Sequence, residues 1–236
     1  MLFSKIIYIF DLETHNMNKS KQDEVTKLFN TKEDLHPELK KYYFISDSGI
    51  PMIKHPLVFS IFHNEVMNHM MNKHYEYKVS EIKKAILILD YAKFIFLHER
   101  PYRLNAFMSI HKLLSDKEYW ECLGEIWTDS ENIWQNKSSW KILLNSKRPL
   151  REHFMDEDDR AAFKNLPEKI TIYRGYHPSK NKNGFSYTLN KTKAIWFSKR
   201  FQSTGVIGEV KERTINKKDC FAYMGGRNES EIITIK

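Results

Sequence analysis

Glycine is distributed very unevenly along this chain, and its distribution limits the architecture more than any other feature. Of the eight glycines in 236 residues, only Gly49 and Gly124 precede residue 168, and the other six follow it. Glycine is favoured in the turns between short strands and is unfavourable inside helices. We therefore predict a mainly helical region at about residues 1–165 and a small β-rich unit at about 166–236.

The first region contains apolar residues at spacings of three and four, which is typical of amphipathic helices. This recurrence is found in residues 56–72 and 80–97. In the second of these segments the stripe consists of Ile82, Ala85, Ile86, Leu89, Ala92 and Phe96. A further helix is predicted at 128–144, because Thr128 precedes Glu131 by three residues, the spacing of a capping box.

The second region consists of short β-prone runs that are separated by Gly, Asn and Lys. These runs are residues 169–176, 184–189, 205–212, 220–224 and 230–235. One helix, predicted at 190–201, interrupts them directly after the second run. The predicted fold class is therefore α+β, with helices first and a sheet last.

The net charge of +8 belongs entirely to the second region. Residues 1–167 contain 24 basic and 24 acidic residues, whereas residues 168–236 contain 14 basic and 6 acidic ones. Such a concentrated positive charge favours an anionic ligand, either a phosphate-bearing cofactor or a nucleic acid. A basic surface that only keeps the protein soluble is the alternative explanation.

Cysteine content and hydropathy bear on the compartment. Cys122 and Cys220 are the only cysteines and lie far apart, so no disulfide framework or cysteine-rich metal site is predicted. The N-terminal apolar run of about five residues is broken by Asp11 and is too short for a signal peptide or a membrane span. We expect a soluble, cytoplasmic protein without a membrane partner.

The segment YIFDLETHN offers one candidate chemistry. Asp11 and Glu13 follow an apolar run and resemble the first carboxylates of a two-metal exonuclease. The polar residues 14–24 argue against it, because that fold requires the sheet to continue at once. The further ligands of this alternative site are Asp90, His153 and Asp159. The histidines at 63, 69 and 74 match no zinc spacing, and no metal is predicted from them.

A second candidate chemistry lies in three ordered pieces of the C-terminal unit. Arg174 ends an apolar run, and Ser186 and Thr188 occupy alternate positions of the next one. Glu229 and Glu231 are two residues apart in the last run, so in a continuous strand both carboxylates leave the same face. Because like charges repel, such a pair must have a use or a partner.

This ordered set resembles a known enzyme family. Arg, then Ser-x-Thr followed by a helix with Ala-x-x-Phe (Ala194 to Phe197), then Glu-x-Glu is similar to the pattern of the Arg-Ser-Glu class of mono-ADP-ribosyltransferases. The resemblance covers about residues 168–236, and the middle element reads Ser-Tyr-Thr where Ser-Thr-Ser is usual. It implies an ADP-ribosyltransferase-like split, mixed β-sheet core, NAD as co-substrate and no metal. A toxin or phage effector is the implied kind of enzyme, which allows for a neutralising antitoxin.

The chemistry of NAD agrees with the roles that the resemblance implies. Arg174 is suited to grip phosphate or ribose oxygens with its planar fork. Glu231 is expected to stabilise the positive charge that develops on the ribose as nicotinamide leaves, with Ser186 holding it in place. Glu229 is expected to orient or deprotonate the acceptor. The implied cofactor-binding residues also include Gly175, Thr188 and Phe197.

The acceptor is the least determined part of the prediction. Tyr223 and Arg227 lie in a loop that resembles the acceptor-recognition loop of the family, and a tyrosine stacks equally well on a base or a guanidinium. The Glu-x-Glu pair favours a protein arginine, whereas the local basic charge favours RNA or DNA. We prefer a nucleic acid, because one diphosphate needs far fewer than eight excess charges. A non-catalytic nucleic-acid-binding module with a degenerate core is a further alternative.

Overall fold

The computed structural model describes residues 31–131, 133–178, 181–200, 207–226 and 229–235. The chain divides into two compact units, Met1–Glu99 and Arg100–Lys236. The predicted division at 165/166 falls inside the second unit. As a division between functional parts it stays a prediction.

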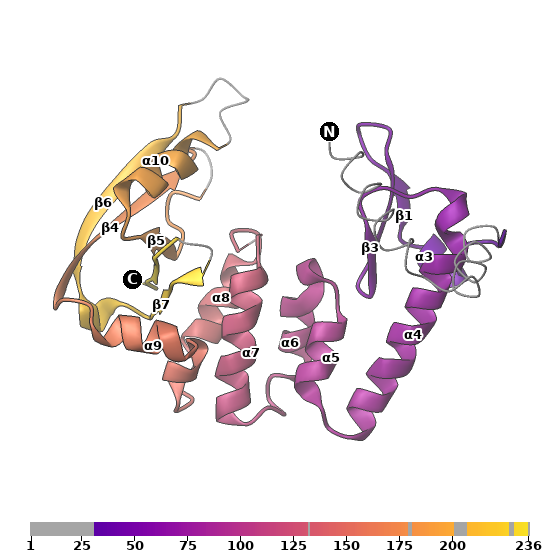
Figure 1. Ribbon diagram of the computed structural model, residues 1–236, viewed down its shortest axis with the longest axis horizontal. Helices are drawn as coiled ribbons and strands as arrows, with labels where there is room; N and C mark the ends of the chain where they lie inside the picture. Colours follow the sequence, from indigo (N-terminus) through magenta and orange to yellow (C-terminus); the bar gives the residue numbers. More distant parts are fainter. Residues whose placement is uncertain (1–30, 132, 179–180, 201–206, 227–228, 236) are drawn as a thin grey trace, which may run out of the picture. The chain divides into compact units, whose positions relative to one another are not determined.

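The first unit contains a small antiparallel sheet in its described residues. Its strands β1 (Tyr43–Ile45), β2 (Pro51–His55) and β3 (Val58–Ser60) lie in the order β1-β2-β3. The helical elements are α3 (Pro37–Lys40), η1 (Glu65–Met67), α4 (Asn68–Leu87) and α5 (Tyr91–Leu97). The core is formed by Leu35, Leu39, Ile53, Leu57 and Val58, against which Met71, Tyr75, Val79 and Ile82 pack. Figure 1 shows these elements in indigo to magenta.

The predictions of two helices in this unit are partly wrong. The segment 56–72 begins with strand β3, and its helix α4 starts only at Asn68. The segment 80–97 is not one helix, because Leu89 takes the left-handed conformation with φ 59°. Asp90 then begins α5 by accepting a hydrogen bond from the Lys93 amide at 2.9 Å. As a result, two residues of the predicted buried stripe, Ile86 and Leu89, are exposed.

The second unit begins with a group of helices. They are η2 (Arg100–Tyr102), α6 (Arg103–Ile110), α7 (Asp116–Asp129), α8 (Lys137–Leu144), η3 (Arg151–Phe154) and α9 (Glu157–Lys164). Their interior contains the fully buried indoles of Trp120, Trp127 and Trp140. In Figure 1, α7 and α8 lie side by side in this part of the chain.

The capping box predicted at Thr128 is wrong. Thr128 lies in the last turn of α7, where its hydroxyl donates to the Gly124 carbonyl at 3.1 Å. The capping box of α7 is formed instead by Ser115 and Glu118, at the other end of the helix. The predicted helix 128–144 is reduced to α8, because α7 already occupies its first residues.

A five-stranded antiparallel sheet completes the second unit. Its strands are β4 (Lys169–Tyr176), β5 (Ser186–Thr188), β6 (Glu209–Asn216), β7 (Ala222–Met224) and β8 (Glu231–Ile233), in the order β6-β4-β5-β8-β7. The helical elements among them are α10 (Lys191–Lys199) and η5 (Lys217–Asp219). All five predicted strands and the predicted helix are therefore found, with shifted ends.

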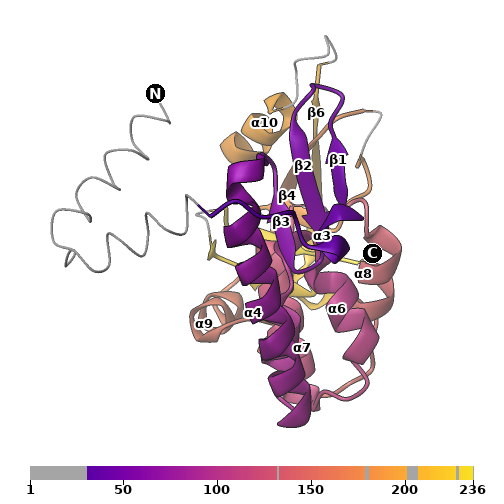
Figure 2. The ribbon, with the colours of Figure 1, turned by 90° about the vertical axis from the view of Figure 1, so that its right-hand side faces the viewer.

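Helix α10 packs on β4 and contacts β6 and β5. A Cβ atom at Gly175 would overlap the carbonyl of Ala194 and the amide of Ser198, so this close approach requires glycine. A core cluster of the sheet contains Ile170, Ile172, Tyr187, Ile215, Cys220 and Ile232. Figures 1 and 2 show α10 lying along the sheet.

Over the described residues the protein has eight α-helices and two antiparallel sheets, so the α+β class is confirmed. The expectation of a mixed sheet is wrong for these residues, because every strand pair of the five-stranded sheet is antiparallel. The sheet β1–β3 departs from the predicted helical character of the first region. None of the helices in the described ranges has the length and apolar character needed to cross a membrane.

Candidate functional site

The three motif pieces lie on neighbouring strands of the five-stranded sheet. Arg174 is on β4, Ser186 and Thr188 are on β5, and Glu231 is on β8, in the order β4-β5-β8. Thr188 is the direct antiparallel partner of Glu231 on one side and of Tyr173 on the other. The fold thus brings together pieces that are separated by up to 57 residues in the sequence, counted from Arg174 to Glu231.

Arg174 and Glu231 nevertheless point to opposite faces of this sheet. Directly opposed residues of antiparallel strands share a face, so Thr188 and Glu231 point to the same side. Arg174 follows Tyr173, the partner of Thr188, and therefore leaves the other side. In agreement, its guanidinium carbon lies 5.9 Å from the ring centroid of Tyr187.

Arg174 is buried and donates its hydrogen bonds to the backbone. Its Nε and Nη2 atoms donate to the Asn181 carbonyl at 3.2 and 3.1 Å, and its Nη1 atom donates to the Ser186 carbonyl. Burial lowers the pKa of Arg174, and the neighbouring Tyr187 and Glu231 partly offset this effect. The guanidinium therefore holds the segment before β5 against the end of β4.

Glu231 is only 7% exposed and is oriented by the indole of Trp127. The indole Nε1 atom lies 3.3 Å from each carboxylate oxygen of Glu231. The backbone beside this carboxylate is fixed as well, because the Thr188 hydroxyl donates to the Glu229 carbonyl at 2.6 Å and the Leu189 amide donates to the Ser230 carbonyl at 3.0 Å. Glu231 is thus a carboxylate in a fixed position.

Glu229 does not belong to strand β8, so the expected alternation does not place it. The strand begins at Glu231, and the intervening Ser230 has the left-handed φ of 45°. A residue in the left-handed region is not extended and therefore interrupts the two-residue repeat of a strand. The expectation that both carboxylates leave one strand face is therefore wrong, and Glu229 lies half-buried in the loop before the strand.

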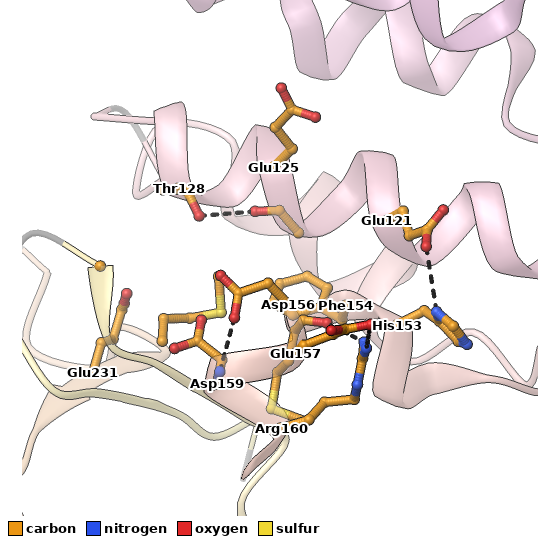
Figure 3. Close-up of a pocket in the computed structure, with 14 residues that line it drawn as sticks. Glu121, Glu125, Thr128, His153, Phe154, Asp156, Glu157, Asp159, Arg160 and Glu231 are labelled. Carbon is orange, nitrogen blue, oxygen red and sulfur yellow. Dashed lines mark hydrogen bonds and ion pairs between the residues drawn. The ribbon is translucent and has the colours of Figure 1, made fainter. Parts of the chain in front are cut away.

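A cavity of about 490 Å³ lies beside Glu231, as Figure 3 shows. Its walls come from α7, η3, α9 and the strands β7 and β8. Among the described residues, six carboxylates line it, namely Glu121, Glu125, Asp156, Glu157, Asp159 and Glu231. Within the same described ranges, its basic lining residues are His153, which is 3.3 Å from Glu121, and Arg160, which donates to the Met155 carbonyl at 2.7 Å. The cavity therefore suits a cationic group and would repel a diphosphate.

Asp159 is a second buried carboxylate in this cavity. It is 8% exposed, and its Oδ1 atom accepts a hydrogen bond from the Gly225 amide at 2.7 Å. Burial raises the pKa of Asp159, the Gly225 amide opposes this shift, and the negative charges of Asp156 and Asp158 add to it. Asp159 thereby ties helix α9 to the start of the loop that leads to Glu229.

No protein-family model, curated protein or solved structure matches this chain. Its own residues therefore carry the evidence for its function. From the sequence, Asp159 is expected only as a metal ligand of the alternative exonuclease. The acidic run 156–159 at a helix start was visible, but only the packing of α9 against β7 determines which of its members is buried.

The other predicted site residues have varied surroundings. Ser186 is half-buried, and its strand partner is Ile233 rather than Glu231. Phe197 is half-buried on α10, where its ring lies 5.0 Å from that of Trp196. Tyr223 is half-buried and packs against the sheet core cluster, and its role in acceptor recognition stays a prediction. The predicted residues that lie outside the described ranges are Arg227, Asp11 and Glu13.

The metal-dependent alternative can be examined only within the described part of the chain. There, no group of three or more His, Cys, Asp or Glu side chains is placed to hold a metal ion. Asp90 caps helix α5 in the first unit, while His153 and Asp159 line the cavity of the second.

Proposed function

We propose that this protein is an NAD-dependent ADP-ribosyltransferase, in which Glu231 promotes the loss of nicotinamide. The observation that carries this proposal is the position of Glu231. It is a buried carboxylate, oriented by Trp127, on the wall of an acidic cavity and next to the strand that carries the Ser-x-Thr element. The three strands that carry the motif, β4, β5 and β8, are neighbours in the sheet, as a common site requires. This neighbourhood supports an ADP-ribosyltransferase-like core.

The charge of the cavity is complementary to one end of NAD. The nicotinamide ring is a pyridinium cation, and positive charge spreads onto the ribose as the bond between them breaks. An acidic lining favours this cationic end, and a fixed carboxylate stabilises the transition state more than the ground state. The diphosphate has the opposite requirement, so we place it outside the acidic lining, toward basic side chains of residues 168–236 other than those of α10.

In this proposal, the main role of Arg174 is structural: it holds β4 and the segment before β5 together. Its three described hydrogen bonds go to the carbonyls of Asn181 and Ser186. A direct contact with the diphosphate requires that phosphate oxygens replace these carbonyls. The predicted role of Arg174 as a cofactor clamp stays a prediction and can be tested separately.

The transfer step needs a group that accepts a proton. An acceptor atom that carries hydrogen attacks the ribose carbon, the bond to nicotinamide breaks, and nicotinamide leaves as a neutral molecule. The proton of the acceptor passes to a carboxylate. Glu229, in the loop before β8, was predicted for this role, and Asp159 is the second candidate because it shares the cavity with Glu231.

Release of nicotinamide from labelled NAD tests the proposed function. The full-length protein is incubated with labelled NAD and cell lysate, with and without nuclease, and with EDTA. We expect nicotinamide release that persists in EDTA, whereas a two-metal exonuclease would depend on metal. If nuclease removes the label from the macromolecular fraction, the acceptor is a nucleic acid. If the label resists nuclease, the acceptor is a protein, for example at an arginine side chain.

The matched controls are two charge-neutral variants. Glu231→Gln should abolish most of the activity, whereas Glu152→Gln removes an exposed carboxylate from η3 that does not line the cavity, and should leave the activity unchanged. Absence of nicotinamide release by the wild-type protein, with or without lysate, would refute the proposed enzyme. A protein that then still binds nucleic acid would fit the non-catalytic binding module.

A further inference from the structure

Helix α10 presents an exposed indole between two cations. The side chain of Trp196 is 53% exposed, although tryptophan is one of the largest apolar residues. The Nζ atom of Lys193 lies 5.8 Å from its ring centroid, and the guanidinium carbon of Arg200 lies 5.5 Å from the same centroid. Both distances are within the range of a cation–π contact.

The outward direction of Trp196 follows from the way α10 packs. Ala194 and Ser198 are the buried residues of this helix, and they face Gly175 of β4. A residue two positions from each of them lies on the opposite side of a helix with 3.6 residues per turn. Trp196 therefore lies on the side of α10 that faces away from β4.

The helix that carries Trp196 is strongly basic. Residues 190–200 contain four basic residues and no acidic one. Lys191 reaches Glu212 of β6 at 3.3 Å. The other three basic residues, Lys193, Lys199 and Arg200, lie within one to two turns of Trp196. An exposed aromatic ring within a cluster of like charges offers both a stacking surface and binding sites for anions.

We propose that the outer face of α10 is a docking surface for single-stranded nucleic acid. A base stacks on Trp196, and the neighbouring phosphates contact Lys193, Lys199 and Arg200. Stacking requires an unpaired base, which is why a single strand fits better than a duplex. Lys193 and Arg200 are seven residues apart, about 10 Å along the helix axis, so they can contact phosphates on both sides of one stacked nucleotide.

This docking surface does not depend on the proposed transferase activity, because binding is measured without NAD. If the enzyme proposal also holds, the surface makes a nucleic acid the preferred acceptor. Binding without nicotinamide release would refute only the enzyme, and nicotinamide release without binding would refute only the docking surface.

The experiment measures the fluorescence anisotropy of labelled single strands of RNA and DNA, about 20 nucleotides long to exceed the usual site size, at low salt. We expect Trp196→Ala to weaken binding about tenfold, the contribution of one stacked base, and Trp196→Phe to retain part of the affinity. Trp134→Ala is the matched control, because Trp134 is also exposed and has the Lys137 Nζ atom 4.9 Å from its ring. This control should bind like the wild type.

An oligonucleotide with abasic positions separates stacking from simple attraction between opposite charges. The wild type should bind it about tenfold more weakly than the intact strand, whereas Trp196→Ala should bind both about equally. Replacing Lys193, Lys199 and Arg200 by Gln should reduce the slope of log K against log salt by about two, and Trp196→Ala should leave this slope unchanged.

Three results would overturn the proposal. They are the absence of binding at low salt, binding by Trp196→Ala as tight as that of the wild type, and displacement of the oligonucleotide by an equal charge of polyglutamate. The last result would assign the surface to an acidic peptide. Melting temperatures of all variants show whether α10 remains folded.

Discussion

Arg174 and Glu231 are both more than nine-tenths buried in the same sheet, but their surroundings differ. Arg174 donates to backbone carbonyls of an adjacent segment and does not line the cavity, whereas Glu231 borders the cavity and accepts from an indole. A charge that is satisfied by the backbone stabilises the fold, while a charge beside an open cavity can act on a ligand. Of these two residues of one sequence motif, only Glu231 is therefore placed to act on a ligand in the cavity.

The largest expected effect is that of Glu231→Gln. Gln retains an oxygen that can accept from Trp127, so the variant should fold normally. It lacks the negative charge that faces the developing cation. We therefore expect NAD hydrolysis and transfer to fall by roughly a hundredfold, equivalent to about 3 kcal/mol of transition-state stabilisation. Quantifying nicotinamide, free ADP-ribose and modified acceptor measures both reactions.

Glu229→Gln is the companion variant for this test. Glu229 lies outside strand β8, so its loss should reduce transfer to an acceptor and leave hydrolysis by water intact. If Glu229→Gln abolished hydrolysis and Glu231→Gln did not, the roles of the two glutamates would be reversed. If both variants behaved like the wild type, neither carboxylate would belong to an active site.

The second prediction concerns stability. Lys cannot donate to the carbonyls of Asn181 and Ser186 with the fork geometry of Arg174, so Arg174→Lys should lower the free energy of unfolding by about 2 kcal/mol. Chemical denaturation measures this change. Arg213→Lys is the matched control, because its guanidinium carbon also lies near the Tyr187 ring, at 5.8 Å, but on a half-buried side chain.

The same variant separates the two roles considered for Arg174. If NAD turnover fell strongly while the stability of Arg174→Lys remained that of the wild type, Arg174 would act on the cofactor and the contrast with Glu231 would disappear. Loss of stability with unchanged turnover in the remaining folded protein would leave Arg174 with a structural role only.

The sequence predicted the elements of the C-terminal sheet, because short β-prone runs and glycines mark their ends. It did not predict the faces of the side chains. These depend on the register of β4, β5 and β8 and on the left-handed conformation of Ser230, which is neither Gly nor Asn. The spacing of two residues between Glu229 and Glu231 places them on one face only in a continuous strand, and Ser230 interrupts the strand there.

The sheet β1–β3 was not predicted, although the sequence contains a signal for it. Residues 46–49 read Ser-Asp-Ser-Gly between two β-prone runs, which is a hairpin signal, and Gly49 has the left-handed φ of 74°. The scarcity of glycine in the first region outweighed this local signal. The acidic cavity could not be predicted in the same way, because its carboxylates come from α7, from α9 with its N-cap residue, and from β8, and meet only in the folded unit.

The third prediction tests how Glu231 is oriented. Trp127→Phe removes the indole donor that lies 3.3 Å from both carboxylate oxygens, so kcat/KM for NAD should fall about fivefold, or about 1 kcal/mol. Trp140→Phe is the matched control, since its ring lies 4.9 Å from that of Trp127 and its indole N–H has no hydrogen-bond partner within the described ranges. An equal loss of activity in both variants would attribute the effect to packing alone.

The smallest effect is expected at Asp159, the other buried carboxylate of the cavity. Its pKa is raised above the ordinary value of 3.8, chiefly by burial, so the folded protein binds this proton more tightly than the unfolded chain does. The contribution of Asp159 to the stability should therefore decrease as the pH rises from 3.8 through the raised pKa, and remain level above it. Asp159→Asn keeps an oxygen for the Gly225 amide and carries no titrating proton, so it should gain stability relative to the wild type over the same interval. Chemical denaturation at several pH values measures this difference. Glu157→Gln, at an exposed position of the same helix that is not a cause of the raised pKa of Asp159, controls for the change in helix charge. A difference that is flat, or that has the opposite sign, would mean that the fold favours the anion of Asp159, as it would if the Gly225 amide outweighed burial.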